Sequence, residues 1–251
     1  MPKLTVKVFG DFGYTWLRKD NDLNDNAFWM GRQDLFFIGQ LTDRISGMLE
    51  ADFHFHSVEP LVSHFHMERA LLRYGLSDLL NVTVGLMHTP IGYWGHTFHH
   101  GAWLQPSIFA PDIFEFERGQ MLGDPKPGGI LPVHNAGIDI SGVTEMGEIG
   151  DVGYNVGLFN GRPDDLDDVS TNSDQNDFKA VNLHLMLMPH HLLEGLQLGG
   201  NFYADKIAAE QAGAANLRFI HGMRELILGG YATYYHGGWE LLGETYWFHH
   251  D

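Results

Sequence analysis

The chain has 251 residues, no cysteine, and a formal charge of −17 from 15 basic and 32 acidic residues. The absence of cysteine excludes a disulfide framework, a thiolate metal site and cysteine catalysis. The acidity argues against nucleic acid as a partner, because a nucleic-acid-binding protein needs a basic surface. No apolar run approaches the roughly 18 to 20 residues that a membrane helix needs. No signal peptide is visible, so we expect that one has been removed or that the chain is a fragment.

Eleven segments alternate apolar and polar residues with the period of two that a strand requires. In the first segment Leu4 and Val6 share one face, while Thr5 and Lys7 share the other. Most segments are roughly 9 to 14 residues long, which suits a tilted bilayer crossing better than a soluble sheet, where strands average about 5 or 6 residues. The predicted strands are 3–16, 28–41, 45–55, 65–74, 80–88, 131–143, 152–160, 178–188, 196–205, 219–235 and 239–248.

The connections between these strands alternate between short and long. The short ones are marked by Thr42, Gly75, Thr144, Pro189 and Gly237. The longer ones are 19–27, 56–64, 89–130, 161–177 and 206–218. Short turns at one end of a sheet of hairpins and long loops at the other are the pattern of a transmembrane barrel. We therefore predict an all-β protein, with residues 1–251 forming a single antiparallel transmembrane β-barrel of up-and-down hairpins in a bacterial outer membrane.

The longest connection, residues 89–130, is rich in aromatic residues, Pro, Gly and His. A loop of this length inside a compact domain is usually functional or disordered, and its aromatic content argues against a disordered linker. We expect a pore loop that folds into, or over, the mouth of the barrel. The charged residues near its middle are the predicted constriction: Glu115, Glu117 and Arg118.

The polar faces of the predicted strands define a lumen. Charged rings around a narrow lumen select ions through their field, and mixed signs with an acidic excess predict a weak cation preference. The alternative is that these charges only pair with one another and hold water. The predicted pore-lining residues are Lys7, Asp11, Glu50, Asp52, Arg69, Arg73, Asp139, Asp205, Glu240 and Glu244.

A soluble β-sandwich or lipocalin-like barrel is the alternative fold, and it would bury the apolar face inward. The polar face of the predicted strands favours the membrane barrel, because it contains the small and polar residues that a watery lumen tolerates. Aromatic residues near the predicted strand ends also favour it, because a membrane interface places them there. These aromatic residues are Tyr14, Trp16, Trp29, Tyr74, Tyr93, Trp94, Tyr154, Trp239 and Trp247.

No metal site, calcium-binding loop or serine-hydrolase motif with the expected spacing is present in the sequence. His88, His96, His99 and His100 suggest a metal site, but their spacing matches no standard one, and we predict no metal and no cofactor. The acidic loop at 161–177 lacks the spacing of a calcium hand and is predicted to be solvated, although its carboxylates could hold divalent cations that bridge surface lipids. No Gly-x-Ser-x-Gly element is present, so we do not expect an enzyme.

Three segments resemble a group of bacterial outer-membrane porins. They are HTPIGYWG at residues 88–95, HHGAWLQPSI at residues 99–108 and GGILPVHNAGIDISG at residues 128–142. The group is the large porin superfamily that includes the phosphate-selective porin O and P type. In such proteins a strand ends in a Gly-Tyr-Trp-type segment, a loop bearing His-Gly and Leu-Gln follows, and a Gly-Gly-Leu-Pro segment re-enters the barrel.

The resemblance implies passive diffusion of small hydrophilic solutes or ions through a water-filled barrel, which contacts outer-membrane lipid and often forms a homotrimer. Phosphate selectivity is not carried over, because the group relies on basic pore residues and this polar face leans acidic. A bacterial barrel usually has an even number of strands and a terminal aromatic residue. This chain ends on Phe248-His249-His250-Asp251 after about eleven strands, so we expect strands to be missing. The alternative functions are a structural barrel, acting as a sheath or anchor for partner proteins, and an outer-membrane hydrolase with a Ser–His pair.

Overall fold

The computed structural model describes residues 2–18, 24–55, 62–98, 106, 111, 113–114, 130–162, 170–171, 177–191, 193–207 and 222–251. These residues form one sheet in which each long strand pairs with the next along the chain, in the order β1-β2-β3-β4-β5-β6-β7-β9-β10-β11-β12. Every neighbouring pair on this path is antiparallel. The two-residue strand β8 (Ser170–Thr171) lies off the path and pairs in parallel with β6. The predicted all-β, up-and-down architecture is therefore confirmed.

All eleven predicted strands are present. The strands on the path are β1 (Lys3–Arg18), β2 (Asn24–Gln40), β3 (Ile45–Phe55), β4 (Val62–Ser77), β5 (Leu80–His88), β6 (His134–Glu145), β7 (Asp151–Phe159), β9 (Ala180–Met188), β10 (Leu196–Ile207), β11 (Met223–His236) and β12 (Trp239–His250). The bounds of β3 and β5 are those predicted. Strand β2 begins earlier than predicted. Strand β6 begins later than predicted, because Pro132 cannot donate a backbone hydrogen bond to the ladder.

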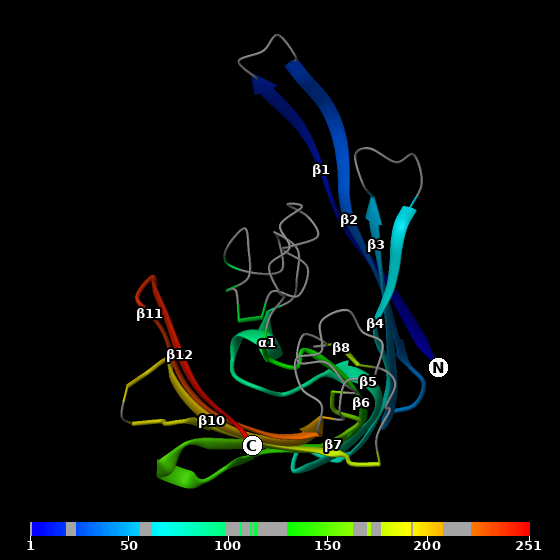
Figure 1. Cartoon of the computed structure of the whole chain (residues 1–251). Helices are drawn as coiled ribbons and strands as arrows, with labels where there is room; N and C mark the ends of the chain where they lie inside the picture. The colour runs from blue at the N-terminus through cyan, green and yellow to red at the C-terminus, as the bar shows by residue number, and fades with distance from the viewer. Residues whose placement is uncertain are drawn as a thin grey trace.

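The sheet curls into an arc, and Figure 1 shows the short helix α1 (Trp94–Thr97) on its concave side. Strands β1 and β12 are the two ends of this arc, since within the described residues β1 pairs only with β2 and β12 only with β11. The short connection between β6 and β7 contains a 3-10 helix, η1 (Gly147–Ile149). In the part of the chain that the structure describes, no helix has the length and apolar character needed to cross a membrane.

The two faces of the sheet have the opposite polarity to that of a soluble protein. Large apolar side chains on the convex face are open to the surroundings: Leu4 is 67% exposed, Phe12 70% and Phe28 71%. Carboxylates on the concave face are buried instead, among them Glu50 and Asp52. A monomeric soluble protein rarely exposes a contiguous apolar surface of this extent, whereas the lipid-facing side of a barrel requires it. The soluble alternative, which places the apolar face inward, is therefore wrong.

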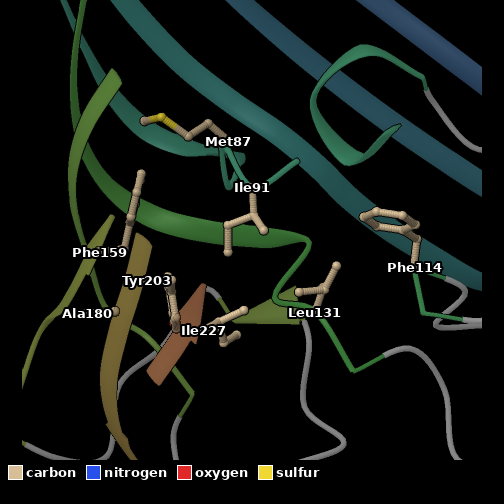
Figure 2. Packing of buried hydrophobic residues seen from close by; sticks show 8 residues of the cluster. All are labelled: Met87, Ile91, Phe114, Leu131, Phe159, Ala180, Tyr203 and Ile227. Atoms are coloured by element: carbon tan, nitrogen blue, oxygen red, sulfur yellow. The ribbon is translucent and has the colours of Figure 1, made fainter. Parts of the chain in front are cut away.

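A buried apolar cluster lies on the concave side of the sheet, and Figure 2 shows Ile91 near its middle. Ile91, Phe114 and Leu131 come from the long connection between β5 and β6. The other members come from the strands: Met87, Phe159, Ala180, Tyr203 and Ile227. The predicted alternation did not include this cluster. Through this cluster the long connection packs against apolar side chains of the strands inside the arc. The concave face is therefore not polar throughout.

Candidate functional site

Residues 89–98, which we call the inward segment, are held against the concave face by polar side chains of the wall. On β6, Asn135 donates its Nδ2 hydrogen to Thr89 Oγ1 at 3.1 Å. On β9, Asn182 Nδ2 donates to the carbonyl oxygen of Pro90 at 3.1 Å. All these side chains are buried, and a buried polar group is costly unless it is hydrogen-bonded. The two asparagines therefore fix the start of the inward segment to the wall.

Two further strands hold the next turn of the inward segment. Asn201 Oδ1 on β10 accepts the Gly92 N–H at 3.2 Å, and Glu244 Oε1 on β12 accepts the Trp94 N–H at 2.6 Å. The Tyr246 hydroxyl donates to Glu244 Oε2. Gly92 has φ +67, and a Cβ there would overlap the Tyr246 hydroxyl and the Glu244 carboxylate. Only glycine combines this backbone conformation with so close an approach to the wall.

The aromatic side chains of the inward segment face the wall of β11. The hydroxyls of Tyr93 and Tyr235 lie 3.1 Å apart, and the rings of Tyr93 and Tyr231 have centroids 5.5 Å apart. The rings of Trp94 and Phe98 make an edge-to-face contact, with centroids 4.8 Å apart. The prediction that Tyr93 and Trp94 belong to a membrane-interface girdle is therefore wrong, because both lie inside the arc. Sequence alone could not separate them from the exposed aromatics of the convex face, namely Tyr14, Tyr74, Trp239 and Trp247.

A chain of polar contacts crosses five strands beneath the inward segment. Asn155 Nδ2 donates to Asp139 at 2.9 Å, and its Oδ1 lies 3.4 Å from His184 Nδ1. Because an amide oxygen only accepts, His184 carries its hydrogen on Nδ1 and leaves Nε2 as an acceptor. The Tyr231 hydroxyl, 3.1 Å from Nε2, donates to it and accepts from Gln197 Nε2 at 3.1 Å. The network fixes the side chains that the inward segment rests on.

His96, on α1, faces this network, with its ring centroid 5.8 Å from that of His184. Part of the His96 side chain meets solvent, yet the surrounding wall removes enough water to lower its pKa, and the positive charge of Arg69 acts in the same direction. The imidazole therefore stays neutral at pH 7, so α1 brings no positive charge to this part of the lumen.

A second buried network anchors the far end of the long connection. The guanidinium of Arg162 donates to the Ile130 carbonyl oxygen, and its Nε lies 3.1 Å from the Glu225 carboxylate. Asp205 accepts the Arg162 backbone N–H at 2.7 Å and the Tyr203 hydroxyl at 3.0 Å. Arg162 belongs to the loop at 161–177 that is predicted to be solvated, whereas the structure buries it. A single arginine beside an acidic stretch gives no signal that it is buried against two carboxylates.

The ten predicted pore-lining residues lie on the concave face, with unequal access to the lumen. Lys7, Arg73 and Glu240 are exposed, and Asp11, Arg69 and Glu244 are half-buried. The remaining four are buried: Glu50, Asp52, Asp139 and Asp205. Arg69 Nε lies 2.5 Å from Glu50 Oε2, so at this point two lumen charges pair with each other. The side chains of these four buried carboxylates have little contact with solvent.

Several other predicted sites have only partial structural descriptions. The constriction residues Glu115, Glu117 and Arg118 lie outside the described residues, as do His99, His100 and most of the acidic loop at 161–177. His88 packs against His134, with ring centroids 4.8 Å apart, and His134 lies 3.0 Å from Glu68. Among the described residues no group of three or more His, Asp or Glu side chains has the arrangement of a metal site.

No protein-family model matches the chain, and neither does any curated protein. Among solved structures, the chain is similar to in-vitro folded OmpT, an outer membrane protein of Vibrio cholerae, with a TM-score of 0.50 and 10% identity. The match covers 99% of this chain and 65% of that one. An OmpT variant lacking loop L8 aligns over 99% and 94% of the two chains with a TM-score of 0.30, and the trimer form of OmpT over 98% and 89% with a TM-score of 0.29, both at 10% identity.

The first of these structures resembles this chain over nearly its whole length. At 10% identity the likeness concerns the fold and not the activity. It agrees with the apolar convex face, the polar concave face and the up-and-down strand order. The chain therefore has the fold of a bacterial outer-membrane β-barrel, and its convex face is built to contact the lipid of that membrane.

Proposed function

We propose that this chain forms the wall of a water-filled pore in the bacterial outer membrane, through which small hydrophilic solutes and ions diffuse passively. The observation that carries the proposal is the inward segment. Wall side chains from four strands hold residues 89–94 against the concave face, and a loop fixed inside a barrel narrows a lumen without sealing it. The pore has no catalytic step and needs no cofactor.

The charges of the concave face favour cations over anions. Exposed Glu240 and half-buried Glu244 stand at one end of the arc, and buried Asp52, Asp139 and Asp205 lie on the same face of the wall. Among the three basic residues predicted to line the pore, Arg69 is paired with Glu50, which leaves Lys7 and Arg73 to oppose these acidic residues. Because acidic rings favour cation passage, the pore is expected to show a moderate cation preference.

The finer features implied by the sequence resemblance belong to the same proposal. Membership of the group that includes the phosphate-selective porins rests on the three matching segments alone, and so does assembly as a homotrimer. Neither feature is needed for passive diffusion through a single barrel.

The proposal is tested by inserting the full-length gene product into a planar lipid bilayer under a salt gradient. Stepwise currents with a reversal potential on the cation side are expected. Anion preference would keep the pore and show that Lys7, Arg69 and Arg73 outweigh the carboxylates. A protein that is folded in the bilayer but carries no current would overturn the proposal and favour a structural barrel that serves as a sheath for partner proteins.

A further inference from the structure

A cavity of about 470 Å³ opens at the short-turn end of β9, β10 and β11. Its apolar lining includes Met188, Pro189 and Leu196, and its polar lining includes Gln197 and Tyr235. Pockets for small ligands have volumes of about 300–1,000 Å³ and combine a mostly apolar wall with a few placed polar groups. The cavity has the volume and the mostly apolar lining of such a pocket, and it is open rather than enclosed.

The cavity adjoins the inward segment through one side chain. Tyr235 lines the cavity, and its hydroxyl lies 3.1 Å from the hydroxyl of Tyr93. Its ring is 39% exposed, so a face of the aromatic system is open to a solute. The cavity therefore lies directly beside the inward segment.

Two neighbouring side chains offer hydrogen bonds at this position. Gln197 and Thr233 are directly opposite each other on β10 and β11. The Gln197 Nε2 hydrogen goes to Tyr231, which leaves Oε1 as an acceptor. Thr233 also lines the cavity, is 1% exposed, and its hydroxyl has no hydrogen-bond partner among the described residues. Burying a hydroxyl without a partner is unfavourable, and a bound solute hydroxyl would remove that cost.

The charge of the lining excludes anionic solutes. No Lys or Arg is found among the described residues that line the cavity, and its ionisable groups are His190, Glu194 and the phenol of Tyr235. His190 already lies 3.4 Å from the Asp151 carboxylate. A phosphate or carboxylate would therefore meet negative charge and no free cationic partner.

We infer that this cavity is a subsite for small neutral polyhydroxylated solutes, that is, for sugars. Sugar hydroxyls match Gln197 Oε1 and the Thr233 hydroxyl, and the C–H face of a sugar ring matches the open face of Tyr235. The inference rests on the proposed function, because the sugar reaches the cavity through the pore. It adds a solute class to a pore that would otherwise discriminate only by size and charge.

The test measures how glucose changes the current through the full-length protein in a planar bilayer, with glucuronate and glucosamine as the anionic and cationic counterparts of the same ring size. Glucose is expected to reduce the current saturably. Tyr235→Ala should raise the half-saturating concentration about tenfold, and Thr233→Val about threefold, by loss of one ring contact and one hydrogen bond. Tyr234→Ala, on the neighbouring position that faces away from the lumen, is the matched control and should change it less than twofold.

Each variant is compared with its own sugar-free current, so a change in conductance alone does not imitate a change in binding. A glucose effect that rises linearly with concentration and is the same in all variants would show viscosity alone and overturn the subsite while leaving the pore intact. A stronger effect of glucosamine or glucuronate than of glucose would also overturn it. Absence of any current would remove the pore and the subsite together.

Discussion

Gly92 is the residue at which the inward segment comes closest to the wall. In Gly92→Ala the new Cβ must displace Tyr246 and Glu244, in a backbone conformation that alanine rarely adopts. We expect the variant to lose about 1–3 kcal/mol of stability and to conduct more, because the segment moves off the wall. Gly237→Ala is the matched control, since Gly237 has φ +59 but no atom within 4 Å of the added carbon. Urea unfolding in lipid vesicles and bilayer currents measure both effects. Equal behaviour of the two variants would contradict the contact.

Arg162 is the residue whose removal should cost the most stability. Its Nε lies 3.1 Å from Glu225, and both side chains are 1% exposed. In Arg162→Ala the Glu225 carboxylate keeps its burial and loses this ion pair, while the contact of its Oε1 with His250 Nε2 at 3.0 Å remains. Removal of one partner of a buried ion pair typically costs about 3–5 kcal/mol. Arg224→Ala removes an exposed arginine from the next position of β11 and should change the free energy of unfolding by less than about 0.5 kcal/mol. Similar urea midpoints for the two variants would refute this role of the pair.

Among single elements, the inward segment is the one whose position should set the conductance. Glu244→Ala removes the acceptor of the Trp94 N–H, a charge-assisted bond worth about 1.5–3 kcal/mol. The segment should then leave the wall on the order of ten times more often, giving larger and noisier single-channel currents. Glu240→Ala removes the same charge from the same face of β12 without touching the segment. Both variants should shift the reversal potential similarly, and only Glu244→Ala should change the noise. Identical noise would argue against the constriction.

The strands could be predicted at the scale of elements because their alternation is local. The alternation of apolar Val6 and charged Lys7 predicts which side of β1 faces lipid and which side faces the interior of the arc. The short turns predict the hairpin connectivity. The inward segment could not be placed in the same way. Its contacts with Asn135, Asn182 and Asn201 join residues far apart in sequence, and an asparagine on a polar strand face looks the same whether it holds a loop or faces water.

The charged site residues were predictable as a set but not in their individual roles. Asp139 and Asp205 lie on the predicted face, yet both are buried within hydrogen-bonded networks. Burial depends on the path of the connections across the concave face, and the local sequence around each aspartate contains no information on that path. The apolar cluster around Ile91 was missed for the same reason.

For the whole molecule, the arrangement separates two environments. The convex face offers apolar side chains to lipid, and the concave face combines carboxylates, a fixed inward segment and a cavity at the short-turn end. A formal charge of −17 then falls mainly on the lumen and the connections, because the lipid-facing positions are apolar. This distribution is what the proposed cation-favouring diffusion requires, and the proposal depends on the concave side being filled with water.

The central claim, a water-filled lumen narrowed by the inward segment, is tested most directly by thiol modification during current recording. The chain has no native cysteine, so Thr97→Cys places a single thiol at an exposed position of α1 inside the arc. A cationic methanethiosulfonate reagent should then reduce the current. Val156→Cys, 44% exposed on the convex face, should leave it unchanged. No block at residue 97, or a block at residue 156 instead, would contradict the assignment of the lumen and of its constriction.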